Sequence, residues 1–250
     1  MLRLLVDPPA GGAWNMAVDE ALLETAAATG QATLRFYQWQ QPTLSLGYFQ
    51  SHADRAQHTT SCGCPIVRRA SGGGAIIHDR ELTYSLALPL AADGRMAATE
   101  LYTICHQTLI RALAEYGILS ELYRPAAECI ATEAVRETQP FLCFQRRTCT
   151  DIVLSGAKIV GSAQRRRRGA VLQHGSVLLA RSAAAPELPG IQDLAGVTIA
   201  ATDLADSWTP HLGAGLKMSP SKSNLARDEI ERAKKLSNER FSALEHLERR

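Results

Sequence analysis

Three consecutive glycines at positions 72–74 stand between two apolar segments, and they limit what this part of the chain can fold into. Residues 66–67 and two arginines precede the glycines, and residues 75–77 follow them and end on His78. Glycine has no Cβ, so its backbone adopts positive φ angles easily and can lie close to a ligand. The pattern predicts a strand, a turn and a second strand in this order.

The glycine turn has two interpretations. It is either a simple hairpin or bend in a sheet, or a loop whose successive amide N–H groups bind an anion or a carbonyl oxygen. Arg68 and Arg69 add fixed positive charge directly before it, which favours the second interpretation. No Gly-Lys-Ser/Thr follows, and the spacing is not that of a dinucleotide-binding G-x-G-x-x-G, so neither nucleotide motif is indicated.

Composition argues against several classes of protein. Apolar residues make up 46% of the 250 residues and charged residues 21%, which is typical of a globular protein with a sizeable core. The formal net charge is +2, which gives no reason to expect a nucleic-acid or membrane partner. No apolar run approaches the roughly 20 residues of a membrane helix, and the first residues lack the apolar segment of a signal peptide. We therefore expect a cytoplasmic protein.

Six cysteines stand at positions 62, 64, 105, 129, 143 and 149. In a cytoplasmic chain of this length we expect free thiols rather than disulfides. Residues 62 and 64 form a C-x-C pair, and no second pair stands at the spacing of a structural zinc site, so no metal site is predicted. Cys105 falls on the apolar stripe of a predicted helix, which indicates core packing.

Hydrophobic patterns in the first half predict alternating strands and helices. Residues 2–6 are expected to form a strand at a sheet edge. Residues 33–39 and 43–48 are expected to form a hairpin joined by residues 40–42, and a further strand is expected at 81–90. A helix is expected from Asn15, and a second one over residues 99–116 with Gly117 as its C-cap. Residues 51–64 are compatible with either helix or loop.

The second half predicts a β-meander. Residues 123–140 have the composition of a polar connector, and strands are expected at 151–154, at 158–160 after a tight turn at Ser155 and Gly156, and at 170–179 after a turn at 165–169. This pattern suits an α+β fold with a mostly antiparallel or mixed sheet flanked by helices. Residues 183–222 indicate loops and short helices, and residues 224–250 indicate a charged helix that packs on the domain or on a partner.

Four segments of the chain form a set. They are residues 14–20 (Trp-Asn-Met-Ala-Val-Asp-Glu), the arginine-glycine segment 68–85, residues 156–164 (Gly-Ala-Lys-Ile-Val-Gly-Ser-Ala-Gln) and residues 172–176 (Leu-Gln-His-Gly-Ser). In this order, and over about residues 1–182, they resemble the lipoate-protein ligase and octanoyltransferase family. The resemblance implies the biotin/lipoate protein ligase fold, which is class II synthetase-like, with a catalytic domain over 1–222 and a charged C-terminal helix over 223–250.

The resemblance also implies which residues surround a substrate. The first helix would border an acyl pocket, and Gly47 and Tyr48 fall where family members line the lipoyl or octanoyl tunnel, although each is equally well a plain sheet residue. The residues that the resemblance assigns to substrate binding are Arg69, Ser71, Gly72, Gly73, Gly74, His78, Gly161, Ser162, Ala163 and His174.

The resemblance assigns the chemistry to Lys158 and Cys143. Lys158 lies in an apolar segment, where a lysine is costly to bury without a partner, and it would stabilise the charge that develops on an acyl carbonyl oxygen. Cys143 stands in a Cys-Phe element fifteen positions before Lys158, as in cysteine-dependent octanoyltransferases. A thiolate attacks a thioester without ATP, and Lys158, Arg146 or Arg147 would favour the ionised thiol. Cys149 is the alternative nucleophile, and a buried structural role is the alternative for Cys143.

Two further features remain open. His78 and His174 are each either a general base, or a group that orients the thiol, or a structural residue of the sheet. The four arginines at 165–168 are either a solvated turn or a docking site for an acidic acyl carrier protein.

The resemblance leads to three hypotheses about function. The first is an acyltransferase that moves an octanoyl or lipoyl group from acyl carrier protein, through a thioester on Cys143, to the target lysine of a lipoyl domain, such as glycine cleavage H protein or a dehydrogenase E2 subunit. It would need no cofactor. The second is a lipoate-protein ligase that uses ATP and Mg²⁺ to form lipoyl-adenylate, with the arginine-glycine loop facing the phosphate. The third is a non-catalytic protein that binds acyl carrier domains, against which the presence of Lys158 argues.

Overall fold

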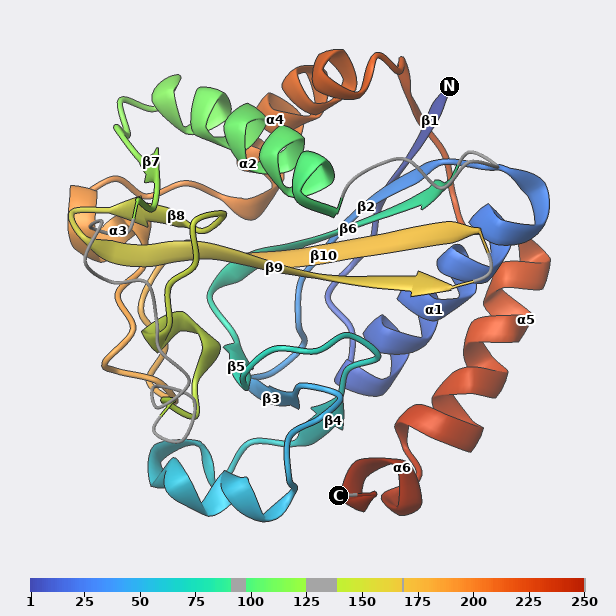
Figure 1. The fold of residues 1–250 in the computed structure, drawn as a ribbon, viewed down its shortest axis with the longest axis horizontal. Helices are drawn as coiled ribbons and strands as arrows, with labels where there is room; N and C mark the ends of the chain where they lie inside the picture. Colours follow the sequence, from blue (N-terminus) through green and yellow to red (C-terminus); the bar gives the residue numbers. More distant parts are fainter. Residues whose placement is uncertain (91–97, 125–138, 168, 250) are drawn as a thin grey trace.

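The protein is described by a computed structural model that covers residues 1–90, 98–124, 139–167 and 169–249. Its centre is an eight-stranded mixed sheet in the order β11-β1-β2-β6-β10-β9-β8-β7 (Figure 1). The strands of this sheet are β1 (Leu2–Val6), β2 (Thr33–Tyr37), β6 (Glu81–Pro89), β7 (Glu121–Leu122), β8 (Ile152–Leu154), β9 (Ala157–Arg167), β10 (Ala170–Leu178) and β11 (Pro220–Lys222). All neighbouring pairs from β2 to β7 are antiparallel, so the predicted α+β class with a mixed sheet is confirmed.

The prediction that residues 2–6 form an edge strand is wrong. β1 pairs in parallel with β2 on one side and with β11 on the other. The segment of β11 reads Pro-Ser-Lys, which has no hydrophobic alternation, so the sequence pattern gives no sign of a strand there.

The predicted hairpin of residues 33–39 and 43–48 is also wrong. β2 already has β1 on one side and β6 on the other, so no edge of it is available for the next strand. The chain instead leaves the large sheet, and β3 (Thr43–Leu46) becomes the central strand of a separate three-stranded sheet with β4 (Ile66–Arg68) and β5 (Ile76–His78). The glycine loop connects β4 to β5, and it therefore lies at the end of this small sheet.

Helices cover both faces of the large sheet (Figure 1). Helices α2 (Ala98–Ala114) and α4 (Ala201–Leu216) pack on one face, where Trp208 and Phe36 belong to the largest apolar cluster. Helices α1 (Gly12–Thr29) and α5 (Arg227–Leu236) pack together on the other face. The predicted second helix and its cap are confirmed, because α2 ends before Gly117, which has a φ of +74°.

The β-meander of β8, β9 and β10 is confirmed with one change. Ser155 and Gly156 both have positive φ and form the predicted tight turn between β8 and β9. The predicted turn at 165–169 is wrong in its first part, since β9 runs to Arg167 and pairs with β10 along its length. Residue 168 of that segment lies outside the described residues.

The remaining segments are short. Residues 51–64 contain the 3₁₀ turns η1 (Ala53–Gln57) and η2 (Thr59–Ser61). Residues 183–222 contain the short helix α3 (Ile191–Ala195), but also the sixteen-residue α4, which the sequence pattern did not indicate. After α5 the chain continues as a π-helical turn (Ser237–Phe241) and α6 (Leu244–Glu248), rather than as one helix to the end. None of the helices in the described ranges has the length and apolar composition needed to cross a lipid bilayer.

Candidate active site

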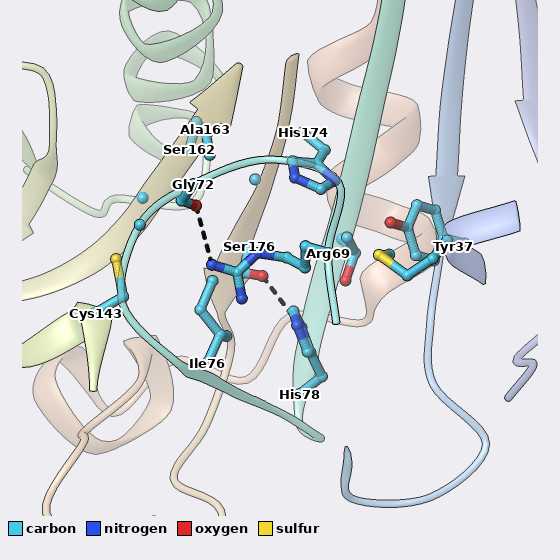
Figure 2. Close-up of a pocket in the computed structure, with 15 residues that line it drawn as sticks. Tyr37, Arg69, Gly72, Ile76, His78, Cys143, Ser162, Ala163, His174 and Ser176 are labelled. Carbon is cyan, nitrogen blue, oxygen red and sulfur yellow. Dashed lines mark hydrogen bonds between the residues drawn. The ribbon is translucent and has the colours of Figure 1, made fainter. Parts of the chain in front are cut away.

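A cavity lies between the glycine loop, β9, β10 and the start of α1. In Figure 2 the loop curves around the Arg69 side chain, with Cys143 on one side and Tyr37 on the other. The residues that line the cavity are Met16, Tyr37, Arg69, Gly72, Gly73, Ile76, His78, Thr83, Cys143, Gly161, Ser162, Ala163, His174, Gly175 and Ser176. Nine of the residues predicted as site residues are therefore brought together around one cavity.

The glycine loop is held from the inside by Arg69. The Arg69 guanidinium donates hydrogen bonds to the carbonyl oxygens of Ser45, Gly72 and Gly74, at 2.7, 3.2 and 2.8 Å. Gly73 has a φ of +98°, a conformation that favours glycine. Burial lowers the pKa of Arg69 to about 10, so the group stays charged at neutral pH. This guanidinium shapes the loop through its carbonyl groups and also lines the cavity, so its assignment to substrate binding stays a prediction.

The amide N–H groups of the loop remain available. Among the described residues, no group accepts a hydrogen bond from the N–H of Gly72, Gly73 or Gly74. Gly72 and Gly73 also line the cavity. The carbonyl groups of Gly72 and Gly74 are bonded to Arg69, whereas the unbonded amides are donors that an oxygen atom of a ligand could use.

His78 lies in a network behind the loop. Glu81 accepts a 2.6 Å hydrogen bond from His78 Nδ1, and Nε2 accepts one of 2.6 Å from the Ser45 hydroxyl, which in turn accepts from Arg69. Burial lowers the pKa of His78, with the Glu81 charge opposing, so a neutral ring bridges the carboxylate and the guanidinium. The Trp39 ring stacks on His78 at a centroid distance of 3.9 Å. This arrangement fixes the imidazole.

His174 lies in a second network that reaches the loop from β10. Its Nε2 is 2.5 Å from the Ser71 hydroxyl, and its Nδ1 is 3.3 Å from Asp19 Oδ2. Asp19 is buried on α1, and it also accepts hydrogen bonds from Arg35 and Tyr37. Burial raises the pKa of Asp19, but the His174 hydrogen bond and the Arg35 charge outweigh this effect and hold it below the usual value. His174 therefore links the loop to a buried carboxylate.

Cys143 and Lys158 meet at the other side of the cavity. Cys143 begins the 3₁₀ turn η4 (Cys143–Gln145) and is half-buried, and the Lys158 Nζ lies 3.9 Å from its sulfur. Asp151 pairs with Lys158 at 2.9 Å, and both side chains are buried. A Cβ on Gly161 would lie 2.6 Å from the Lys158 Cε, so the lysine chain passes over a position that only glycine leaves open. The fold thus places a buried ammonium group beside the sulfur.

The other cysteines are separate from this site. The five described cysteines are free thiols, as predicted, and Cys129 lies outside the described residues. Cys105 is buried in the core of α2, which confirms its predicted packing role. Cys149, the alternative nucleophile, is exposed and does not line the cavity. Within the described part of the chain, no three His, Cys, Asp or Glu side chains are arranged to hold a metal ion.

The arginines of β9 are largely engaged within the protein. Arg167 and Arg165 pair with the buried Glu20 of α1 at 2.6 and 3.9 Å, and Arg240 from the C-terminal segment joins them at 3.2 Å. The interpretation of a solvated turn is wrong for these residues, and the docking site for an acyl carrier protein stays a prediction. Arg166 is exposed, and Arg168 lies outside the described residues.

Sequence reasoning found most but not all of the site. Ser71, Gly74 and Lys158 do not line the cavity directly, but Ser71 contacts His174, and a Cβ on Gly74 would lie 3.1 Å from the Cys143 backbone. Asp151 and Asp19 were not predicted as site residues, although Asp19 belongs to the segment 14–20 that the resemblance placed at the pocket. Asp151 has no pattern of its own, because its pairing with Lys158 depends on the fold.

Known proteins match this chain in sequence and in fold. An octanoyltransferase LipM from Kyrpidia tusciae is 39% identical over 182 residues, which cover 71% of this chain and 65%, just under two thirds, of that relative. A lipoate-protein ligase A crystal structure with bound ATP has a TM-score of 0.79 at 20% identity, over 98% of both chains. An archaeal bi-partite lipoate protein ligase from Thermoplasma acidophilum, studied with its E2 lipoyl domain, has a TM-score of 0.76 at 19% identity, over 98% of this chain and 96% of that one.

The match to the family itself is broad. Residues 12–186 match the model of the lipoyl protein ligase A/B catalytic domain, which confirms the resemblance seen in the four sequence segments. The chain therefore belongs to the lipoyl protein ligase A/B catalytic domain family and has the fold of its ligases.

Proposed function

We propose that this protein is an octanoyltransferase that moves an octanoyl group from acyl carrier protein to the target lysine of a lipoyl domain. The observation that carries the proposal is the position of Cys143, whose sulfur lies at the cavity and 3.9 Å from the Lys158 ammonium. The octanoyltransferase relative from Kyrpidia tusciae supports the same activity.

The lining of the cavity supports an acyl ligand. Thr83 and Ser176 line it, but both of their hydroxyl groups donate to Glu81 Oε1, at 2.5 and 3.2 Å. Their hydrogen-bonding groups are thus used within the wall, and Met16 and Ile76 add apolar surface. The exposed lining of the cavity is mostly apolar, which suits an octanoyl or lipoyl chain.

In the first half-reaction, the Cys143 thiolate attacks the thioester carbonyl of octanoyl-acyl carrier protein. A C–S bond to Cys143 forms, the C–S bond to the carrier breaks, and the carrier thiolate takes up the proton that Cys143 released. Lys158 and the amide groups of residues 72–74 would stabilise the tetrahedral oxyanion. The support for this role is that these amides have no acceptor among the described residues.

In the second half-reaction, the lysine amine of a lipoyl domain attacks the acyl-enzyme. A C–N bond forms, the C–S bond to Cys143 breaks, and the thiolate takes up the proton that the amine loses. The thioester is already activated, so no ATP and no cofactor are needed. A dehydrogenase E2 subunit or a glycine cleavage H protein is the proposed acceptor, and the archaeal structural relative studied with its E2 lipoyl domain supports this class.

An ATP-dependent lipoate-protein ligase is the second candidate, because the structural relative with bound ATP has the same fold. It would need a cation for the adenylate phosphate, and ATP with Mg²⁺. The guanidinium groups of Arg68 and Arg69 are bonded to backbone carbonyl groups, for example to Leu247 and Gly74. The ligase also gives no role to the thiol beside Lys158, so it ranks below the transferase. A non-catalytic carrier-binding protein ranks third, because it leaves the pair of Lys158 and Asp151 unexplained.

The test is intact-protein mass spectrometry after incubation with octanoyl-acyl carrier protein and no ATP. We expect an octanoyl adduct of about 126 Da, which hydroxylamine removes as it removes other thioesters. The adduct should be absent in Cys143→Ala and present in Cys149→Ala, which is a matched control because its thiol is exposed and lies outside the cavity.

Two outcomes would contradict the proposal. A Cys143→Ala protein that still transfers octanoyl groups at the wild-type rate would exclude the covalent route. A wild-type protein that forms no adduct, and that acylates a lipoyl domain only when ATP and the free acid are supplied, would favour the ligase.

A further inference from the structure

A buried histidine on α2 has no part in the reaction described above. His106 has no exposed surface and lies between the turn before β8 and the strand β9. Its Nδ1 contacts the carbonyl oxygen of Thr150, and its Nε2 lies 2.7 Å from the Ser162 hydroxyl, which borders the cavity. The hydrophobic pattern of the helix gave no indication of these two contacts, because His106 stands among residues that pack in the core.

The direction of these hydrogen bonds follows from the groups involved. A carbonyl oxygen only accepts, so Nδ1 of His106 carries the proton and donates to Thr150. The neutral ring then accepts at Nε2, and the Ser162 hydroxyl must donate to it. Ser162 in turn accepts from the Tyr84 hydroxyl at 2.8 Å, and Tyr84 accepts from Gln173 at 2.7 Å. Burial lowers the pKa of His106 to about 4, which agrees with a neutral ring at physiological pH.

The Thr150 carbonyl belongs to the turn that also carries Asp151, the ion-pair partner of Lys158. The Asp151 N–H donates to the Thr148 carbonyl at 2.9 Å, and Asp151 Oδ2 accepts from the Thr148 N–H at 2.6 Å. The same Oδ2 is 2.9 Å from the Lys158 Nζ. His106 is therefore bonded to the residue directly before the carboxylate that holds the lysine.

The other end of the ring is bonded to the strand over which Lys158 passes. Ser162 follows Gly161, and a Cβ on Gly161 would meet the Lys158 side chain at 2.6 Å. The imidazole thus spans the gap between the turn that holds Asp151 and the strand that supports the lysine chain. A change in this spacing would move the Lys158 ammonium relative to the Cys143 sulfur.

We infer that His106 is a positioning residue, which acts through Thr150 and Ser162 to hold the ion pair of Asp151 and Lys158 against the Cys143 thiol. This inference deepens the proposed transferase function and rests on it for the catalytic consequence. It concerns orientation only, since His106 contacts neither the cavity nor the sulfur. A misplacement of about 1 Å in such a group can cost a large factor in rate.

The test compares His106→Leu, which can make neither hydrogen bond, with His106→Gln, which keeps an N–H donor and a carbonyl acceptor. Two rates are measured for each protein: alkylation of Cys143 by iodoacetamide, followed by peptide mass spectrometry, and formation of the octanoyl adduct. We expect His106→Leu to lower both rates about 10-fold at pH 7, and His106→Gln to restore most of this loss.

Leu109→Ala is the matched control, because Leu109 is buried on the same helix one turn later, in the apolar core. It should lower the melting temperature, as His106→Leu does, and leave both rates unchanged. The inference is overturned if His106→Leu keeps the wild-type alkylation rate, or if Leu109→Ala lowers that rate as much as His106→Leu does. Alkylation needs no acyl donor, so this result stands apart from the proposed function, which fails if the wild-type protein forms no adduct.

Discussion

The two sides of the cavity are built in different ways. On the side of the glycine loop, Arg69 makes hydrogen bonds to three backbone carbonyl groups, and both His78 and His174 end on buried carboxylates. On the side of the thiol, the charged group is held by its ion pair with Asp151 and by the bonds of His106 around that pair, and the thiol itself is half-buried.

This difference separates two tasks. The loop side is fixed by many buried bonds, which suits groups that must stand ready to meet a developing charge. The thiol side has a half-buried sulfur that lines the cavity, which suits the nucleophile of the proposed transfer between two proteins. The comparison predicts that substitutions on the loop side mainly cost stability, whereas substitutions on the thiol side mainly cost rate.

The largest effect is expected on the thiol side, from Lys158→Met. Loss of the ammonium removes the positive charge beside the sulfur and the developing oxyanion, so octanoyl-adduct formation should fall by about 10²- to 10³-fold. Stopped incubations analysed by intact-protein mass spectrometry measure this rate. The control is Lys222→Met, on the exposed strand β11, which should behave as wild type. A Lys158→Met protein with a rate within twofold of wild type would remove the lysine from the mechanism.

A smaller effect, and one of another kind, is expected on the loop side from Arg69→Met. The substitution leaves the carbonyl groups of Ser45, Gly72 and Gly74 without their donor, and it removes the counter-charge of Glu81. We expect the free energy of unfolding to fall by about 3 kcal/mol, measured by urea denaturation.

The control for this stability measurement is Arg147→Met. The Arg147 guanidinium lies over the Tyr123 ring and has no ion pair with any described residue, so a change below about 0.5 kcal/mol is expected. If Arg69→Met unfolds as the wild type does, the loop is not held in the way that the geometry indicates, and the contrast between the two sides is lost.

The sequence predicted residues on both sides of the cavity, but not all of the contacts that hold them. Cys143 and Lys158 were predicted as site residues because each stands in a local motif, and a motif is recognised from neighbouring residues without knowledge of the fold. The hydrogen bonds of Arg69 to the loop's own carbonyl groups were not predicted, because only the fold shows where its guanidinium lies. Asp151 and His106 were missed for a similar reason. Their partners lie on other elements, and neither residue has a pattern within a few positions of itself.

The same reasoning explains the errors in the fold. The hairpin predicted after β2 was wrong because both edges of β2 are taken by β1 and β6, which are distant in sequence. Strand and helix patterns are local, and they were largely right for β6, β10 and α2. Which strand lies beside which is decided by competition for edges, and hydrophobic periodicity says nothing about that competition.

The smallest predicted effect is a pH dependence of folding stability that arises from His106 on the thiol side. The pKa of His106 is about 4 in the folded protein, against an ordinary value near 6.5 in the unfolded chain. Between these values the unfolded chain binds a proton that the folded protein does not, so folding stability falls as the pH drops and is unaffected above about pH 7. For His106 alone, the loss between pH 7 and pH 5 is about 2 kcal/mol. The charged groups that face the ring are Asp151 and Lys158.

Urea denaturation of wild type and His106→Gln at pH 7 and pH 5 isolates this contribution, because all other titrating groups are shared by the two proteins. The wild type should lose about 2 kcal/mol more than the variant over this range. Equal losses would mean that His106 accepts a proton in the folded state. In that case both ring nitrogens would donate, the Ser162 hydroxyl would turn away from the ring, and a cation beside Lys158 would weaken its pairing with Asp151. The geometry of the thiol side would then be sensitive to mild acid through the charge on this ring.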